Sequence, residues 1–297
     1  MSAACPADDH AMPQPLPVLP PARARVLTII SSPAPDPHEI TTIVMSDPAL
    51  AAAVMRAANS AWSAPRTAVR TVDRAIIRIG PKETLQIVGA AVLSSTFEEL
   101  EQAGLLVDEL WRHVVAAGLL TELLVDEDQP RDIRAAAYSA GLLHDIGRLA
   151  MAAEHPEAYG RVVEAVRGGT PVHEAERREF GTAHTLRGVE AATAWSVTRL
   201  IHGAIRDHHE PPATLAAPMA HAVARAVEIC WRLGISDGVR IHGGDEDESL
   251  TAEDEWVLSK IGGAEVLHAR VEWFRAAMRA EPEKRPSDRL PPKRRIA

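Results

Sequence analysis

Signals for the start of an α-helix recur along this chain and constrain its fold more than any other feature. The pairs Asp36-Pro37 and Asp47-Pro48 each place a carboxylate that can cap a helix directly before a proline at the first helical position. Thr71 precedes another run of regularly spaced apolar residues in the same way. Since no convincing stretch of strict apolar–polar alternation accompanies these signals, we predict an all-α fold, a helical bundle.

The spacing of apolar residues between such signals predicts the individual helices. Gly80 and Pro81, which follow one another, are typical of a helix end and of the next helix start. The predicted helices begin near residues 21, 37 and 48 and then span 72–79, 81–92, 105–124, 131–151 with a break at 144–145, 156–166, 172–180, 184–195, 197–208, 218–233, 251–261 and 264–279.

The composition is that of an ordinary globular protein, with 46% hydrophobic and 25% charged residues but only 4% aromatic ones. The core must therefore consist mainly of aliphatic side chains, with alanine allowing helices to pack closely. The formal net charge of −9, from 41 acidic and 32 basic residues, argues against a nucleic-acid partner because phosphate binding needs an excess of positive charge.

Two cysteines, Cys5 and Cys230, are too few for a disulfide framework or a cysteine-based zinc site, which fits a reducing compartment. No apolar run approaches the roughly 18 residues that cross a bilayer. The first residues lack the basic and apolar regions of a signal peptide. We therefore expect a cytoplasmic protein without a membrane segment.

Shifts in composition divide the chain into segments. Proline-rich or strongly polar stretches have too little apolar content to order themselves, whereas the segments between them carry helical patterns. The predicted segments are a disordered leader at 1–15, the main body at 16–235, a polar linker at 236–250, C-terminal helices at 251–280 and a disordered tail at 281–297.

The most specific local pattern is an apolar helical run that ends in the adjacent pair His144-Asp145. An imidazole and a carboxylate together suit a divalent transition metal. The same pair is also typical of a buried histidine held by a carboxylate, and that alternative stays open on these two residues alone. His113, His184 and the doublet His208-His209 lie near other helix ends or on apolar faces, so the histidines can converge inside a bundle as ligands do in helical metal sites.

The order of several short phrases adds a resemblance to a known family. The segments 16–20, 46–50, 57–61 and 75–80 precede the histidine pattern, and the whole resembles the HDOD family, the HD-related output domains of bacterial signalling proteins. The resemblance covers about residues 16–235. It implies an N-terminal helical lobe, residues 16–100, packed on a degenerate HD-type lobe, residues 101–235. The family generally acts in signal transduction, often near cyclic-di-GMP or two-component pathways, and no catalytic activity is usually attributed to it.

For the site, the resemblance to the HD superfamily of metal-dependent phosphohydrolases implies specific roles. It makes His113, His144 and Asp145 the candidate ligands of a divalent metal such as iron, manganese or zinc. The candidates for binding a phosphate or a second metal are His184, His208, His209 and Arg148. No residue is assigned a catalytic role and no cofactor is expected. A bound divalent metal is the alternative to a vestigial site in which His113, His144 and Asp145 no longer hold a metal.

This chain departs from the active HD enzymes in three places. The final metal-binding Asp of the family falls on Ala224, which cannot ligate, and Arg225 next to it adds a positive charge if it points inward. His208-His209 begins like the signature of the HD-GYP enzymes, which hydrolyse cyclic di-GMP, but the Gly-Tyr-Pro element is absent. Arg148 stands where active relatives usually carry Lys, and an arginine cannot donate a proton near neutral pH.

Three hypotheses follow. The first is a non-catalytic regulatory module that acts on a protein partner in a bacterial signalling pathway, with the HD pocket as a packing centre or a small-ligand sensor. The second is a metal-dependent phosphohydrolase or phosphodiesterase. The third is a nucleotide sensor that binds cyclic di-GMP without cleaving it.

Overall fold

The computed structural model describes residues 19–65, 67–97, 100, 104–239 and 249–279, and every regular element within them is a helix. The predicted all-α fold is therefore confirmed. The predicted leader at 1–15 and the tail at 281–297 lie outside the described residues, as does 240–248 of the predicted linker.

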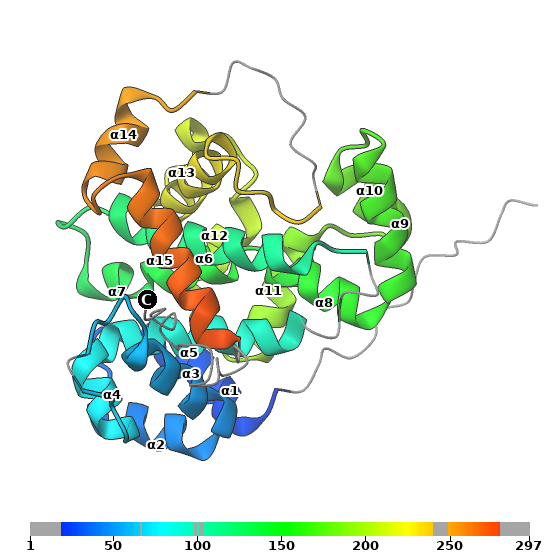
Figure 1. Ribbon diagram of the computed structural model, residues 1–297. Coiled ribbons are helices and arrows are strands. Elements are labelled where there is room, and N and C mark those ends of the chain that lie inside the picture. The colour runs from blue at the N-terminus through cyan, green and yellow to red at the C-terminus, as the bar shows by residue number, and fades with distance from the viewer. Residues whose placement is uncertain (1–18, 66, 98–99, 101–103, 240–248, 280–297) are drawn as a thin grey trace, which may run out of the picture.

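The N-terminal lobe consists of the first helices of the chain (Figure 1). Three of them, the second to the fourth, start at capping residues seen in the sequence. The side chain of Asp36 accepts a hydrogen bond from the backbone N–H of His38 at 2.9 Å, and Asp47 accepts one from Ala49 at 2.8 Å. The helices of this lobe are α1 (Pro21–Ile29), α2 (Pro37–Ser46), α3 (Pro48–Asn59), α4 (Val72–Ile79) and α5 (Pro81–Phe97).

Among the described residues, no single helix combines the length and apolarity that crossing a bilayer requires. Helices α2 and α3 reach that length and composition only when taken together, and the chain bends by 116° between them.

The HD lobe is built around α6 (Val107–Leu124), which packs most extensively on α7 (Arg131–Leu143) and on α13 (Pro218–Arg232). Glycine permits the closest approach: a Cβ built on Gly141 would lie 2.4 Å from the carbonyl oxygen of Ala117. The remaining helices of this lobe are α8 (Ile146–Glu154), α9 (Pro156–Arg167), α10 (Val172–Phe180), α11 (His184–Ala194) and α12 (His202–Asp207).

One predicted helix is wrong in detail. The segment predicted as a single helix over 197–208 is a short 3-10 turn, η2 (Arg199–Ile201), followed by α12. Ser196 has a φ of 56°, which ends the preceding helix, and the Thr198 side chain caps η2 by accepting from the Leu200 N–H at 3.4 Å. The segment therefore begins as a 3-10 turn, and α12 ends at Asp207, directly before His208.

The C-terminal helices α14 (Ala252–Ser259) and α15 (Ala264–Met278) pack on both lobes. Figure 1 shows α15 crossing the molecule from α14 toward the N-terminal lobe, and it contacts α3, α5 and α6. Arg56 of α3 donates to the carbonyl oxygen of Ala277 at 2.7 Å, and Arg275 pairs with Asp108 of α6 at 2.8 Å. The C-terminal helix therefore links the two lobes.

Candidate metal centre

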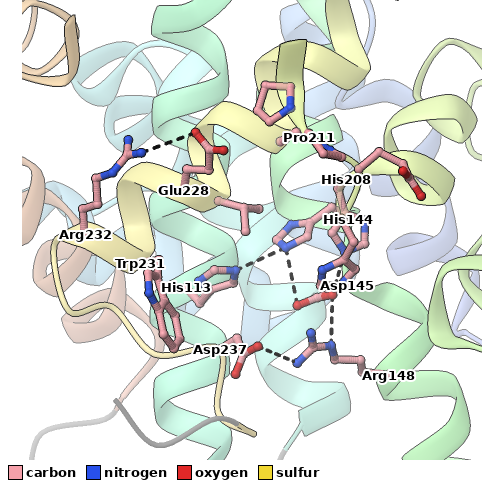
Figure 2. Close-up of a pocket in the computed structure, with 15 residues that line it drawn as sticks. His113, His144, Asp145, Arg148, His208, Pro211, Glu228, Trp231, Arg232 and Asp237 are labelled. Atoms are coloured by element: carbon pink, nitrogen blue, oxygen red, sulfur yellow. Dashed lines mark hydrogen bonds and ion pairs between the residues drawn. The ribbon is translucent and has the colours of Figure 1, made fainter. Parts of the chain in front are cut away.

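The structure brings every site residue named from the sequence into one cluster inside the HD lobe. Figure 2 shows His113, His144, Asp145, Arg148 and His208 in this cluster. His113 comes from the middle of α6, whereas His144 and Asp145 occupy the break between α7 and α8. His184 opens α11, and the doublet at 208–209 follows α12. The residues that are 3% exposed or less are His113, His144, Asp145, Arg148, His184 and His208.

A small residue sets the distance between two of these elements. A Cβ on Gly147 would lie 1.8 Å from the carbonyl oxygen of His184, so no larger residue fits where α8 meets α11. The glycine that follows the His144-Asp145 pair in the sequence therefore holds His184 next to Asp145.

The ligand-type atoms form three groups, of which two share Asp145 and the third consists of His173, Glu176 and His184. In the first, His113 Nε2 lies 3.3 Å from His144 Nε2, and His144 Nε2 lies 3.4 Å from Asp145 Oδ2. In the second, Asp145 Oδ1 lies 3.3 Å from Nε2 of both His184 and His208. His209 completes the second group, because its Nε2 lies 3.1 Å from that of His184. Within each group the ligand-type atoms all lie within 4.8 Å of one another.

In three of the rings, those of His144, His184 and His208, the opposite nitrogen faces a protein acceptor. Nδ1 of His144 lies 2.7 Å from the Gly141 carbonyl oxygen, and Nδ1 of His208 lies 2.9 Å from that of Ile205. Nδ1 of His184 lies 2.7 Å from a carboxylate oxygen of Glu176. Since an acceptor at Nδ1 holds the proton there, the neutral ring presents the lone pair of Nε2, and these lone pairs converge. This is the arrangement of histidines prepared to bind a cation.

Burial and charge hold three of these groups in the ligand form at neutral pH, whereas His184 differs: burial by itself lowers its pKa, but the carboxylate of Glu176 outweighs burial and raises that pKa. Burial, reinforced by the neighbouring imidazole of His144, lowers the pKa of His113 to about 4. Burial likewise lowers the pKa of His208 to about 3. For Asp145, burial by itself raises the pKa, but the charge of Arg148 and the contacts with His144 outweigh it and hold that pKa well below its usual range. Two neutral imidazoles and one ionised carboxylate result.

Asp145 and Arg148 are buried together without full compensation. Arg148 Nε lies 3.1 Å from Asp145 Oδ1, but the pair makes an ion-pair contact without hydrogen-bond geometry, so both atoms lack a hydrogen bond. A buried carboxylate oxygen without a hydrogen bond is costly unless a cation binds it. This orphaned oxygen, together with the converging imidazoles, fits a divalent transition metal.

Sequence reasoning missed two carboxylates of the site. Glu176 on α10 is fully buried and accepts from both the Nδ1 and the backbone N–H of His184. Asp237 lies in the segment predicted as a linker, yet it is only 7% exposed. Its Oδ2 lies 3.1 Å from Nη1 of Arg148. Nothing in the local pattern distinguishes Glu176 from the other charged residues of α10, and Asp237 has no helical periodicity that could reveal it.

The cluster opens on a cavity of about 410 Å³. Ala224 lies in its wall, so the position where the HD enzymes carry their final Asp faces the pocket but offers only a methyl group. Arg225 does not add its charge to the site, because it pairs with Glu228 at 2.6 Å and with Asp254 at 2.8 Å. Ala224 therefore offers no ligand atom to the pocket.

Comparisons with known proteins agree with this architecture. The model of the HDOD domain matches residues 16–211. An uncharacterized protein of Treponema pallidum (strain Nichols) is 25% identical over 202 residues, which cover 66% of this chain and 38% of that protein. This chain therefore spans well under half the length of that relative.

Solved structures also share the fold. An HDOD domain protein of unknown function from Geobacter sulfurreducens has a TM-score of 0.67 at 22% identity, over 89% of this chain and 93% of its own. A proposed signal transduction protein from Marinobacter aquaeolei VT8 has a TM-score of 0.68 at 20% identity, and the match covers 88% of this chain and 60% of that protein. A proposed phosphohydrolase from Shewanella amazonensis SB2B has a TM-score of 0.62 at 22% identity, and the match covers 89% of this chain and 93% of that protein. At such identities the likeness shows a shared fold alone.

Proposed function

The chain belongs to the HDOD family, and from this premise we propose that it is a regulatory module of bacterial cytoplasmic signalling whose His/Asp pocket binds a divalent transition metal. The observation that carries the proposal is a set of buried imidazoles around the carboxylate of Asp145. Nε2 of His184 and His208 faces its orphaned oxygen Oδ1, and Nε2 of His144 faces Oδ2, while Nδ1 of each of these rings faces a protein acceptor. The similar structure from Marinobacter aquaeolei VT8, proposed to act in signal transduction, is consistent with this role.

The pocket residues divide into those that hold the metal and those that hold the ligands in place. The first metal position has His113, His144 and Asp145, and the second has Asp145 with His184, His208 and His209. A bound metal supplies a Lewis acid for an anionic oxygen. Glu176 keeps the proton of His184 on Nδ1, and Arg148 keeps Asp145 ionised.

Regulation is favoured over turnover because two features of the active enzymes are changed. Ala224 removes a carboxylate ligand, and loss of even a ligand's supporting partner costs roughly 10–100-fold in metal affinity or activity. Arg148 is held protonated by Asp145 and Asp237 and cannot donate a proton near neutral pH. Metal binding then acts mainly on conformation, because it ties α6, α7, α11 and α12 together and stabilises the state that binds it. A protein partner would recognise the helical surface in that state.

A metal-dependent phosphohydrolase is the second candidate. It is favoured by the two adjacent donor groups that share Asp145 beside an open cavity of about 410 Å³, since paired metals can hold both the attacking and leaving oxygens of a phosphoryl transfer. The similar structure from Shewanella amazonensis SB2B, a proposed phosphohydrolase, also agrees with this alternative.

The deciding experiment is the metal content of protein purified without chelators, measured by inductively coupled plasma mass spectrometry. We expect near-stoichiometric iron, manganese or zinc, lost in His144→Ala and retained in His268→Ala, which changes an exposed histidine of α15. Folded protein free of metal would contradict the proposal. A screen with phosphomonoesters and phosphodiesters then separates the candidates, because turnover that disappears in His144→Ala and Asp145→Ala would establish the hydrolase.

A further inference from the structure

A second cavity, of about 440 Å³, lies where the N-terminal lobe meets α15. None of its lining residues belongs to the metal-binding cluster. They come from the segment after α3, from α4 and α5, and from α15, and they are Trp62, Ser63, Arg78, Ile79, Glu83, Arg270 and Trp273.

One wall of this cavity is a fixed aromatic surface. The ring of Trp62 stacks on that of Trp273, with centroids 5.8 Å apart and planes 19° from parallel. Trp273 is held in turn, because its indole Nε1 donates to Ser60 Oγ at 2.8 Å, and it is only 7% exposed. Trp62 is 47% exposed although one face of its ring is covered. The other face offers a planar surface on which a second ring can stack.

The same cavity carries an excess of positive charge. Arg78 donates to the hydroxyl and the carbonyl oxygen of Ser63, and no carboxylate of the described residues forms an ion pair with it. Arg270 pairs with Glu83 only at 3.7 Å and donates to Gln86 at 3.3 Å. Two guanidinium groups thus face one carboxylate, and arginine's planar fork matches the oxygens of a phosphate.

From these features we infer that the cavity is a binding site for a nucleoside monophosphate. Its base stacks on the free face of Trp62, and its phosphate binds Arg78 and Arg270. The volume of about 440 Å³ falls within the range of roughly 300–1,000 Å³ that small-molecule sites occupy, which favours a small ligand over a protein segment.

The site gives such a ligand a means to act on conformation. α15 supplies Arg270 and Trp273, whereas the N-terminal lobe supplies Trp62 and Arg78. The ligand therefore contacts both α15 and the N-terminal lobe. α15 also lies outside residues 16–211, the part of the chain that matches the HDOD model. Because a ligand that bridges two surfaces stabilises their contact, binding strengthens the docking of α15 on α3.

Isothermal titration calorimetry with GMP and AMP tests this inference on the full chain. We expect saturable binding of at least one of them at about 1 mM or below. Guanosine or adenosine without the phosphate, and inorganic phosphate alone, should each bind at least about tenfold more weakly, since each engages only half of the site. Trp62→Ala and Arg78→Gln should each weaken nucleotide binding by about tenfold or more.

Matched controls separate the cavity from other parts of the molecule. Trp256→Ala removes another exposed tryptophan, 62% exposed and covered by Lys260 rather than by an aromatic ring, and should leave binding unchanged. His144→Ala should also leave it unchanged, so failure of the metal proposal leaves this one standing. The inference is overturned if neither nucleotide binds at about 1 mM, if the nucleosides bind as well as the nucleotides, or if Arg78→Gln has no effect. Arg78 is exposed, so that variant remains informative even if Trp62→Ala does not fold.

Discussion

The N-terminal lobe and the HD lobe fill their interiors with different kinds of side chain. The N-terminal lobe buries mainly aliphatic residues, such as Leu27, Ile40 and Leu50, and keeps its charges at helix caps and on the surface. The HD lobe buries two carboxylates and an arginine, Asp145, Glu176 and Arg148, among its histidines. Burying charge costs free energy unless it is compensated. The interior of the HD lobe should therefore contribute less to the free energy of unfolding than the aliphatic interior of the N-terminal lobe.

A buried carboxylate outside the pocket sharpens this contrast. Asp254 of α14 is as buried as Asp145, but the backbone N–H of Thr251 donates to it at 2.9 Å. Arg225 and Arg232 donate to its two oxygens at 2.8 and 2.9 Å. Asp145 has an oxygen without any hydrogen bond. Incomplete compensation is therefore a property of the pocket and not of buried carboxylates in this fold.

The largest expected effect tests the cost of buried charge directly. Arg148→Met leaves Asp145 without its buried cation and should destabilise the protein by about 3–5 kcal/mol. Urea unfolding of metal-free protein, followed by circular dichroism, measures it. A loss below about 1 kcal/mol would mean that water compensates Asp145 and that the pocket stores little strain.

The corresponding change in the N-terminal lobe should affect stability alone. Leu50→Ala removes a side chain that is 1% exposed and should cost about 2–5 kcal/mol, because it leaves a cavity in close-packed surroundings. The metal content of the folded fraction should equal that of the unmutated protein. A fall in metal content at unchanged folded fraction would show that the two lobes are coupled, against the division of roles drawn above.

The carboxylate that orients His184 should matter for affinity more than for folding. Glu176→Gln keeps the size of the side chain but weakens its hold on the Nδ1 proton, and it should lower metal affinity by roughly 10–100-fold. Competition with a chelator of known affinity measures this. The control is Glu174→Gln on the same helix, whose exposed carboxylate pairs with Arg178 at the surface. Equal affinities of the two variants would exclude a positioning role for Glu176.

The fold could be predicted from the sequence because its signals are local. Capping residues such as Asp36 and Thr71 act within one turn of a helix, and the apolar spacing that follows them is visible in a short window. The one wrong helix, over 197–208, failed because Thr198 caps a new turn inside an apolar run. The apolar spacing continues past Thr198 and predicts one helix, whereas the Thr198 side chain starts a separate turn.

The candidate site could be predicted only in part. His113, His144 and Asp145 carry a recognisable residue type at a helix face or end, and the structure brings them together. Glu176 and Asp237 act through tertiary contacts with His184 and Arg148, and their sequence neighbourhood holds no trace of those contacts. Such supporting carboxylates are defined by contacts between helices that lie far apart in the chain, and a single sequence does not show which helices are in contact.

The smallest expected effect concerns the well-compensated carboxylate and the pH at which it contributes. Burial by itself raises the pKa of Asp254, but the hydrogen bonds of Thr251 and the charges of Arg232 and Arg225 outweigh it and lower that pKa below its usual value. A group whose pKa is lower in the folded state stabilises the fold fully above its unfolded pKa, about 3.9 for Asp, and loses that contribution as the pH falls through the folded pKa.

Asp254→Asn should therefore cost about 1 kcal/mol at neutral pH, through the weakened helix cap and ion pairs, and the difference from the unmutated protein should shrink below about pH 4. Urea unfolding at a series of pH values measures both curves. A difference that stayed constant down to low pH would show that the hydrogen bonds of Asp254, and not its charge, hold α14, and the contrast with Asp145 would then be one of geometry alone.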